Sequence, residues 1–157
     1  TAMRADPFGY VVLVSTHQQR VFWNGLLRGG RTDPAVGDLV MASHNEPSKG
    51  VSKWVRGTIK RLAEARGGWL ADIELETGRT VYGQAITSSS LGVGRPGEKR
   101  VTWIWGNALT VHASQGAGYG TVIYVPQVAP GSQACITANH AYTAITRART
   151  TLVVVEP

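Results

Sequence analysis

The sequence predicts an α/β protein built on a parallel sheet, with a small antiparallel β-barrel inserted into it. Continuous apolar runs such as residues 10–16 are typical of strands that are buried on both faces of a parallel sheet. Between residues 36 and 86 the pattern changes to short strand-like runs separated by turn signals. After residue 100, strand and helix patterns alternate again, which favours a parallel sheet with helices on both faces.

The first segment, residues 1–35, is predicted to hold a strand followed by a helix. The run YVVLVST at residues 10–16 is apolar and rich in β-branched side chains, which favours a buried strand. Apolar residues at helical spacing come next, and a pair of glycines after them is a stop signal. The apolar residues are Val21, Phe22, Leu26 and Leu27, and the glycines are Gly29 and Gly30.

The insert is predicted over residues 36–86, as an antiparallel barrel of four short strands. Its clearest turn is ETGR at residues 76–79, because a Thr-Gly pair between two alternating runs favours a hairpin. Residues 87–100 are rich in Ser, Gly and charge, and are predicted to form the return connection. Residues 101–157 are predicted to resume the parallel sheet, with a helix over residues 133–149.

The composition is that of a folded domain with a basic balance. A chain of 157 residues with 43% hydrophobic content can bury one sizeable core or a core plus a small module, which excludes a disordered tail. The net charge of +6 favours an anionic partner such as nucleic acid, since Lys and Arg neutralise phosphates. A basic domain without such a partner explains the charge equally well.

The single cysteine, Cys135, cannot form an internal disulfide, which predicts a reducing compartment and a cytoplasmic location. It lies in the apolar run ACITA, where a small buried side chain is a better interpretation than a nucleophile. No metal site is predicted, because His17, His44 and His140 have no metal-ligand spacing with one another or with Cys135. No apolar run is long enough to predict a membrane-spanning helix.

Two short motifs carry the functional signal. The first is TVHASQG at residues 110–116, a polar, Gly-containing loop after an apolar run. The second is AYTAITRAR at residues 141–149, a helix-like segment that ends in two arginines. Both compositions suit contacts with phosphates. The chain has no GxxxxGK[ST] phosphate loop, so it would supply only half of a nucleotide site.

The order of these segments resembles the second RecA-like domain of a superfamily 1 DNA helicase, of the UvrD-like C-terminal type and closest to the RecD/Dda group. Residues 15–28 (STHQQRVFWNGLLR) are similar to motif IV of the family, and GDLVM at residues 37–41 to the start of its inserted SH3-like barrel. The run ALTVHASQG at residues 108–116 resembles motif V, and residues 141–149 resemble motif VI. The resemblance covers nearly the whole chain.

The resemblance implies an ATP site shared with an N-terminal RecA-like domain outside this chain, which would bind most of the ATP and Mg²⁺. Arg147 would be the arginine finger that stabilises charge on the γ-phosphate. Arg20 would be a second phosphate-contacting arginine, although a structural role for it is equally compatible with the sequence. Gln115 and Gly116 would lie on the nucleotide side, where Gly allows close backbone approach.

The same resemblance implies a single-stranded DNA track. Thr110 and His112 would contact DNA phosphates, and period-two alternation predicts that they lie on the same side of a strand. In the insert, Trp54 is expected to stack on bases, with Lys53 and Arg56 beside it. Packing inside the barrel is the competing interpretation for the tryptophans.

The predicted function is therefore the C-terminal half of an ATP-dependent DNA helicase. The isolated chain is not expected to hydrolyse ATP efficiently, whereas the whole protein would be an enzyme. Two departures from the family pattern leave alternatives open: Ala113 replaces the usual Lys of motif V, and Gly118 replaces an acidic residue. A helicase-like docking module for DNA or protein without motor activity is one alternative, and the helicase portion of a conjugative relaxase is another.

Overall fold

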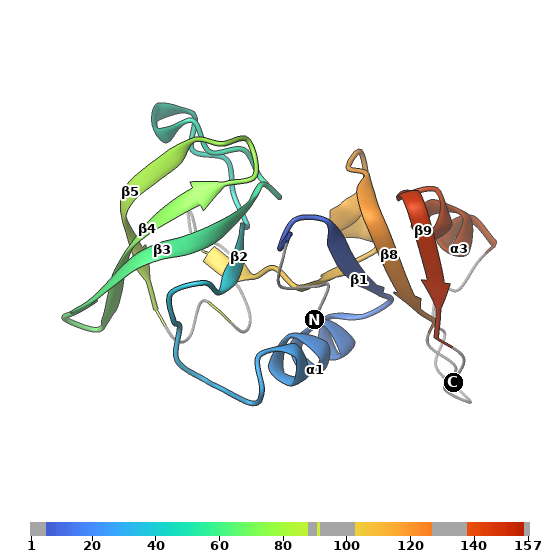
Figure 1. The fold of residues 1–157 in the computed structure, drawn as a ribbon, viewed down its shortest axis with the longest axis horizontal. Coiled ribbons are helices and arrows are strands. Elements are labelled where there is room, and N and C mark those ends of the chain that lie inside the picture. Colours follow the sequence, from blue (N-terminus) through green and yellow to red (C-terminus); the bar gives the residue numbers. More distant parts are fainter. Residues whose placement is uncertain (1–5, 88–90, 92–102, 127–137, 156–157) are drawn as a thin grey trace. The chain divides into compact units, whose positions relative to one another are not determined.

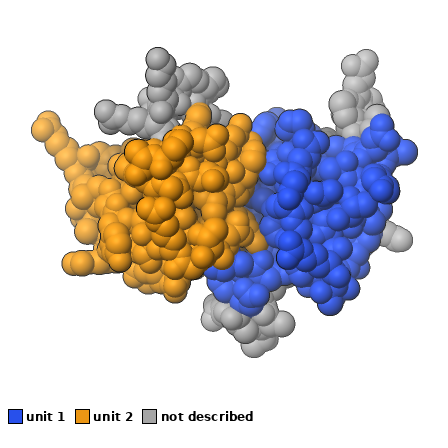
Figure 2. Space-filling view, turned by 90° about the horizontal axis from the view of Figure 1, so that it is seen from above, with its two compact units in different colours: residues 1–24, 107–157 blue, residues 25–106 orange. Residues whose placement is uncertain are grey.

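The structure is a computed structural model that describes residues 6–87, 91, 103–126 and 138–155. The chain divides into two compact units, which Figure 2 shows in different colours. One unit comprises residues 1–24 and 107–157 and contains a parallel sheet. The other comprises residues 25–106 and contains an antiparallel sheet. The predicted α/β class with a parallel sheet is thus confirmed.

The parallel sheet has the strand order β7-β1-β8-β9. Its strands are β1 (Tyr10–Val14), β7 (Ala108–Thr110), β8 (Tyr119–Val125) and β9 (Ala148–Val154) (Figure 1). Strand β1 pairs with β7 on one side and with β8 on the other, and its last four residues are fully buried. The continuous apolar run at the start of the chain therefore forms the centre of this sheet, as predicted.

Two helices accompany the parallel sheet, α1 (His17–Leu27) and α3 (Ala138–Ile145). The crossover through α1 leads from β1 to β7, whereas the crossover through α3 leads from β8 to the opposite edge of the sheet. Because parallel crossovers are right-handed, these two directions put the helices on opposite faces. The start of the helix predicted over residues 133–149 lies outside the described residues, as does Cys135. The predicted end of this helix is wrong, because α3 ends at Ile145 and residues 148–149 already belong to β9.

Local signals explain where α1 begins and ends. The Thr16 hydroxyl accepts a hydrogen bond from the Gln19 N–H, and Gln19 Oε1 accepts one from the Thr16 N–H, which is a reciprocal capping box. At the other end, the Gly30 N–H donates to the Gly25 carbonyl, and Gly29 and Gly30 have φ of +67° and +75°. Left-handed glycines of this kind end helices, so the predicted stop is confirmed.

Three of the apolar side chains of α1 face solvent, while Trp23 and Leu27 are partly buried. Val21, Phe22 and Leu26 are 42%, 64% and 58% exposed, while the polar residues Arg20 and Asn24 are buried. Apolar residues at helical spacing normally mark the buried face of a helix. Here the opposite face is fixed by hydrogen bonds from Asn24 to the sheet, which periodicity alone does not reveal.

The antiparallel sheet has the strand order β5-β4-β3-β2-β6. Its strands are β2 (Leu39–Ala42), β3 (Arg56–Ala65), β4 (Gly68–Leu75), β5 (Thr80–Ile86) and β6 (Trp103–Trp105). The hairpin predicted at residues 76–79 joins β4 and β5. The described strands form an open sheet with β5 and β6 as its edges, so the predicted closed barrel is not observed. A short 3₁₀ helix, η2 (Pro47–Lys49), lies between β2 and β3.

The antiparallel unit extends further than the predicted insert of residues 36–86. Strand β6 pairs with β2, with Trp105 opposite Val40, although the sequence analysis assigned this run to the segment 101–157. The unit has its own apolar core, in which Trp103 is fully buried and Trp69 is partly buried against the cluster. A three-residue strand carries no local signal for its partner, so only the non-local pairing places it here.

No helix among the described residues is long and apolar enough to cross a membrane.

Candidate functional site

The loop after β7 is a tight turn held by its own hydroxyl groups. Thr110 ends the strand, and its Oγ1 accepts a hydrogen bond from the Ala113 N–H at 3.3 Å. Ser114 is fully buried, and its hydroxyl donates to the Val111 carbonyl at 2.7 Å. Gly116 has φ of +83°, a conformation that favours glycine. The small polar residues of the TVHASQG motif therefore fix the shape of the loop.

This turn separates two residues that were predicted to lie on the same side. The chain leaves the strand at Thr110 and enters a 3₁₀ helix, η3 (His112–Ser114), so period-two alternation stops there. Thr110 is buried, whereas His112 and Gln115 are exposed. The surface of the loop is thus formed by His112, Gln115 and Gly116, and the Thr110 hydroxyl serves the loop itself.

The arginine of the second motif lies against this loop. Arg147 follows α3, and its Nη1 donates a hydrogen bond to the Ala117 carbonyl at 3.2 Å. Its Nε donates to the Thr143 carbonyl, also at 3.2 Å, and its backbone carbonyl accepts from the Tyr119 N–H at 2.8 Å. Ala117 directly follows the TVHASQG motif and is 30 residues from Arg147 in the sequence, so the structure places this arginine against the residue next to the first motif.

Arg20 and Asn24 are one turn apart on the buried face of α1. Burial lowers the pKa of the Arg20 guanidinium, because desolvation disfavours its charged form. The Asn24 side chain donates to the carbonyls of Arg20 and Ala108, both at 2.9 Å. It also accepts from the N–H groups of Asn107 and Ala108, both at 3.0 Å. Asn24 thus anchors α1 to the strand that leads into the TVHASQG loop.

In the antiparallel unit, the Lys53–Trp54 pair lies in the connection that precedes β3. Trp54 is half-buried and has φ of +71°, the only positive φ of a non-glycine residue in the described part of the chain. The Lys53 Nζ lies 4.5 Å from the centroid of the Trp54 ring, a cation–π distance. The Lys53 N–H also donates to Asn45 Oδ1 at 2.6 Å, which fixes the backbone of this loop.

Arg56 does not share this exposed position. It is buried, and its Nε lies 3.6 Å from Glu76 Oε2. Its backbone N–H also donates to Glu76 Oε1 at 3.2 Å. The prediction that Arg56 stands beside Trp54 at a DNA surface is corrected here, because its side chain is directed into the unit and is compensated by a carboxylate.

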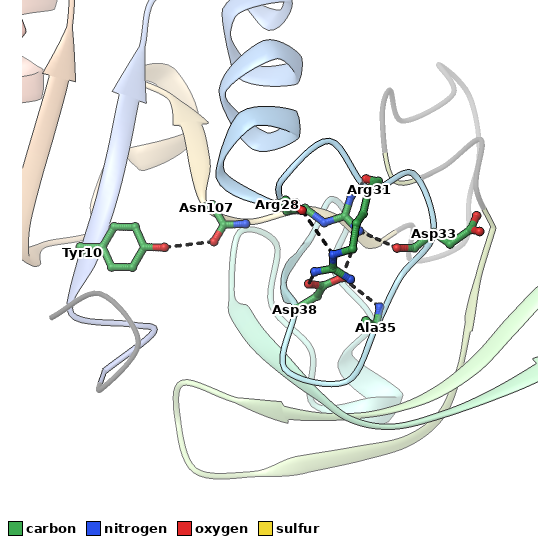
Figure 3. A network of polar contacts seen from close by, with 7 residues as sticks. All are labelled: Tyr10, Arg28, Arg31, Asp33, Ala35, Asp38 and Asn107. Atoms are coloured by element: carbon green, nitrogen blue, oxygen red, sulfur yellow. Dashed lines mark hydrogen bonds and ion pairs between the residues drawn. The ribbon is translucent and has the colours of Figure 1, made fainter. Parts of the chain in front are cut away.

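Arg28 is a third buried arginine, beside Arg20 and Arg56, and the sequence predicted no role for it. Arg28 contacts Asp38 Oδ2 at 3.0 Å, and its guanidinium carbon lies 3.1 Å from the centre of the Trp105 ring. Arg31 contacts the other carboxylate oxygen of Asp38 at 2.6 Å, and the Ala35 N–H donates to Oδ2 at 2.9 Å (Figure 3). Burial lowers the pKa of Arg28, and the hydrogen bond to Asp38 opposes this shift.

Figure 3 also shows a contact within the other unit, where the Tyr10 hydroxyl donates to Asn107 Oδ1 at 3.2 Å. Asn107 precedes β7, so this bond and those of Asn24 hold the start of that strand. Asn24 and Arg28 lie in the stretch of residues 15–28 that resembles motif IV, but the sequence predicted no role for either of them. A polar residue among apolar helical positions, as at Asn24, was the available sign of a buried hydrogen bond.

One known protein family matches the last third of the chain. Residues 106–155 match the UvrD-like helicase C-terminal domain. The predicted resemblance to a UvrD-like helicase C-terminal domain is confirmed over these residues. The matched residues run from β7 to β9 and include both the TVHASQG motif and Arg147. No curated protein matches the chain.

Solved helicases share the fold of nearly the whole chain. A Pif1 helicase from Bacteroides, solved with ADP-AlF3 and single-stranded DNA, is 16% identical with a TM-score of 0.67, over 94% of this chain and 40% of that one. The same helicase bound to single-stranded DNA is 17% identical with a TM-score of 0.65, over 92% of this chain and 40% of that one. Pif1 from Candida albicans is 15% identical with a TM-score of 0.63, over 95% of this chain and 45% of that one.

At these identities the likeness establishes a shared fold. The chain spans about 40% of the length of the solved Bacteroides helicases that it matches.

Proposed function

We propose that this chain is the C-terminal, RecA-like half of an ATP-dependent DNA helicase. The observation that carries the proposal is the contact between Arg147 and the carbonyl of Ala117, the residue that directly follows the TVHASQG motif. An arginine beside a loop with exposed polar residues can contact the phosphates of a nucleotide, while the loop contacts a nucleic acid. The family match over residues 106–155 supports the same assignment.

Arg147 is proposed as the arginine finger. Its hydrogen bonds go to carbonyl and hydroxyl oxygens, and none of the ion pairs among the described residues includes it. The positive charge is therefore uncompensated and can stabilise charge that develops on a transferred phosphoryl group. The phosphate loop, the Mg²⁺ ligands and most ATP contacts are proposed to come from an N-terminal motor domain.

The other predicted nucleotide residues divide into two kinds. Gln115 is exposed on the loop and Gly116 has an open backbone, so both are available to a ligand. Arg20 is buried on α1, and its lowered pKa reflects the cost of that burial. Because Arg20 is buried, we propose a structural role for it in α1 and no contact with phosphate.

The DNA track is proposed to use exposed residues of both units. In the parallel unit the candidate is His112, which lies on the surface of the loop. In the antiparallel unit the candidates are Lys53 and Trp54, where a ring and a cation are already paired. Solved Pif1 structures with single-stranded DNA support this partner. The RecD/Dda subtype and the SH3-like character of the antiparallel unit remain predictions.

The test is Arg147→Ala in the full-length protein. The expected result is a loss of ATP turnover of about 10³-fold or more, with unchanged affinity for single-stranded DNA, because an arginine finger acts mainly in the transition state. Steady-state ATPase rates and fluorescence anisotropy with a labelled oligonucleotide measure the two quantities. Turnover within a few-fold of the wild type would refute the finger assignment.

A docking module without motor activity is the second candidate. It is favoured by Ala113, which is buried where the family pattern has a phosphate-seeking Lys. A module of this kind predicts that the full-length protein binds single-stranded DNA or a protein partner but shows no DNA-stimulated ATP hydrolysis. The ATPase measurement on the wild type therefore separates the two candidates.

A further inference from the structure

The two arginines of the RAR sequence at residues 147–149 reach the same few residues of the loop before β8. Strand pairing causes this, because Tyr119 at the start of β8 lies opposite Ala148 at the start of β9. Arg147 and Arg149 stand on either side of Ala148, and Ala117 and Gly118 directly precede Tyr119. Arg147 uses this proximity to bond to the Ala117 carbonyl.

Arg149 occupies the space above Gly118. A Cβ atom placed on Gly118 would lie 2.7 Å from Arg149 Nε and 3.3 Å from Cζ, so the guanidinium lies where a side chain would otherwise be. The φ of Gly118 is not in the left-handed region. The absence of a side chain at Gly118 therefore leaves room for the flexible Arg149 side chain, and no left-handed turn requires glycine there.

The strand is irregular at this point. The register changes between Tyr119 and Thr121: Tyr119 pairs with Ala148 but Thr121 pairs with Thr151, so β9 contains one extra residue. A β-bulge redirects side chains and is frequent beside functional sites. The bulge falls on residues 149–150, the part of β9 that holds Arg149.

Nothing in the described part of the chain neutralises Arg149. It is exposed, and it takes part in none of the hydrogen bonds or ion pairs of the described residues. Lys49 and Lys60, by contrast, each pair with a glutamate even at the surface. Two guanidinium groups on one Gly-containing loop, without a carboxylate, form a place of concentrated positive charge.

We propose that Arg149 joins Arg147 in a single phosphate-binding site on residues 117–118, with Gly118 as the residue that makes room for the second guanidinium. This inference rests on the proposed function for Arg147 and adds a second cation to it. The ligand is a phosphate group, from either a nucleoside triphosphate or a DNA backbone. Two guanidinium groups can together donate hydrogen bonds to more oxygens of one phosphate than a single arginine can.

The experiment is a titration of the 157-residue chain, labelled with ¹⁵N, followed through the arginine Nε–Hε resonances. Tripolyphosphate represents the nucleotide source and the octamer dT8 the backbone source. The expected result is that Arg147 and Arg149 resonances shift together with one of these probes. Arg149→Ala and Gly118→Ala should each weaken that binding about fivefold, because each removes one charge-assisted contact.

Matched controls separate this site from general effects. Arg66→Ala removes one exposed charge from the β3–β4 turn, and Gly25→Ala adds a Cβ that meets nothing within 4 Å. Both should bind the probe like the wild type. Arg149→Lys should recover only part of the affinity, because Lys keeps the charge but lacks the fork.

The outcomes distinguish this inference from the proposed function. If Arg147→Ala weakens binding of tripolyphosphate while Arg149→Ala and Gly118→Ala do not, the finger assignment stands and the two-arginine site is wrong. If Arg147→Ala weakens binding of dT8, the finger assignment is contradicted. If neither probe moves the two arginine resonances, the two-arginine site is also wrong, and the turnover of full-length Arg147→Ala decides the proposed function independently.

Discussion

The two units use arginine in different ways. In the antiparallel unit, Arg28 and Arg56 are buried, and each contacts a carboxylate, from Asp38 and Glu76. In the parallel unit, Arg147 bonds to backbone carbonyls and an adjacent hydroxyl. A buried charge needs a partner to be tolerated, whereas an exposed charge without one remains available to a ligand. Arginine therefore supports the fold at the buried positions Arg28 and Arg56, whereas Arg147 is a candidate for phosphate binding.

The strongest test of this difference in role is to replace one arginine in each unit and compare the stability of the two variants. Arg28→Ala should lower the free energy of unfolding of the chain by about 3–5 kcal/mol, because it leaves Asp38 without its buried partner and removes the contact with Trp105. Arg147→Ala should lower it by less than about 1 kcal/mol, as expected for a charge near the surface. Urea denaturation measures both. Equal losses in the two variants would show that the arginines do not differ in role.

A smaller effect tests whether the parallel unit also depends on a buried polar residue. Asn24→Ala should cost about 2–3 kcal/mol, because it leaves buried groups of Asn107 and Ala108 without their partner. Amide hydrogen exchange at Ala108, which donates to Asn24, should accelerate. Asn139→Ala, at an exposed position of α3, is the matched control and should change neither quantity. Unchanged exchange at Ala108 would contradict the anchoring role.

The smallest expected effect concerns the Lys53–Trp54 loop and sharpens the comparison within the antiparallel unit. Trp54→Ala should weaken binding of single-stranded DNA by about tenfold, because one stacking platform is lost. Trp69→Ala should instead lower stability and leave the DNA affinity unchanged, since Trp69 packs against the core. Fluorescence anisotropy with an oligonucleotide and urea denaturation separate the two effects. If both variants bind DNA like the wild type, the loop does not belong to the track.

Local sequence signals predicted most of the elements. The apolar run at residues 10–16 gave the central strand, the glycine pair ended α1, and the Thr-Gly turn joined β4 to β5. These signals succeed because the backbone preferences that cause them act over a few neighbouring residues. The predictions of which side chains are exposed at the surface were less accurate. Arg56 is buried, and Thr110 does not share the surface of His112.

The candidate site was predictable in part. The TVHASQG and AYTAITRAR motifs identified the loop and the arginine that contact each other. Asn24 could not be found in this way, because its partners are backbone groups more than eighty residues away in the sequence. Nor could the position of Arg149 above Gly118, which depends on the register of β8 against β9 and on the bulge between them.

The sequence by itself determined that β1 is a buried strand, that α1 ends at a glycine pair and that a turn joins β4 to β5. Only the tertiary structure decided that β6 pairs with β2, that α1 presents Phe22 to the surface, and that Arg147 lies on Ala117. The physical reason is the range of the interactions. Capping, glycine conformation and periodicity act between residues a few positions apart, whereas strand pairing and burial depend on groups that meet only when the whole chain has folded.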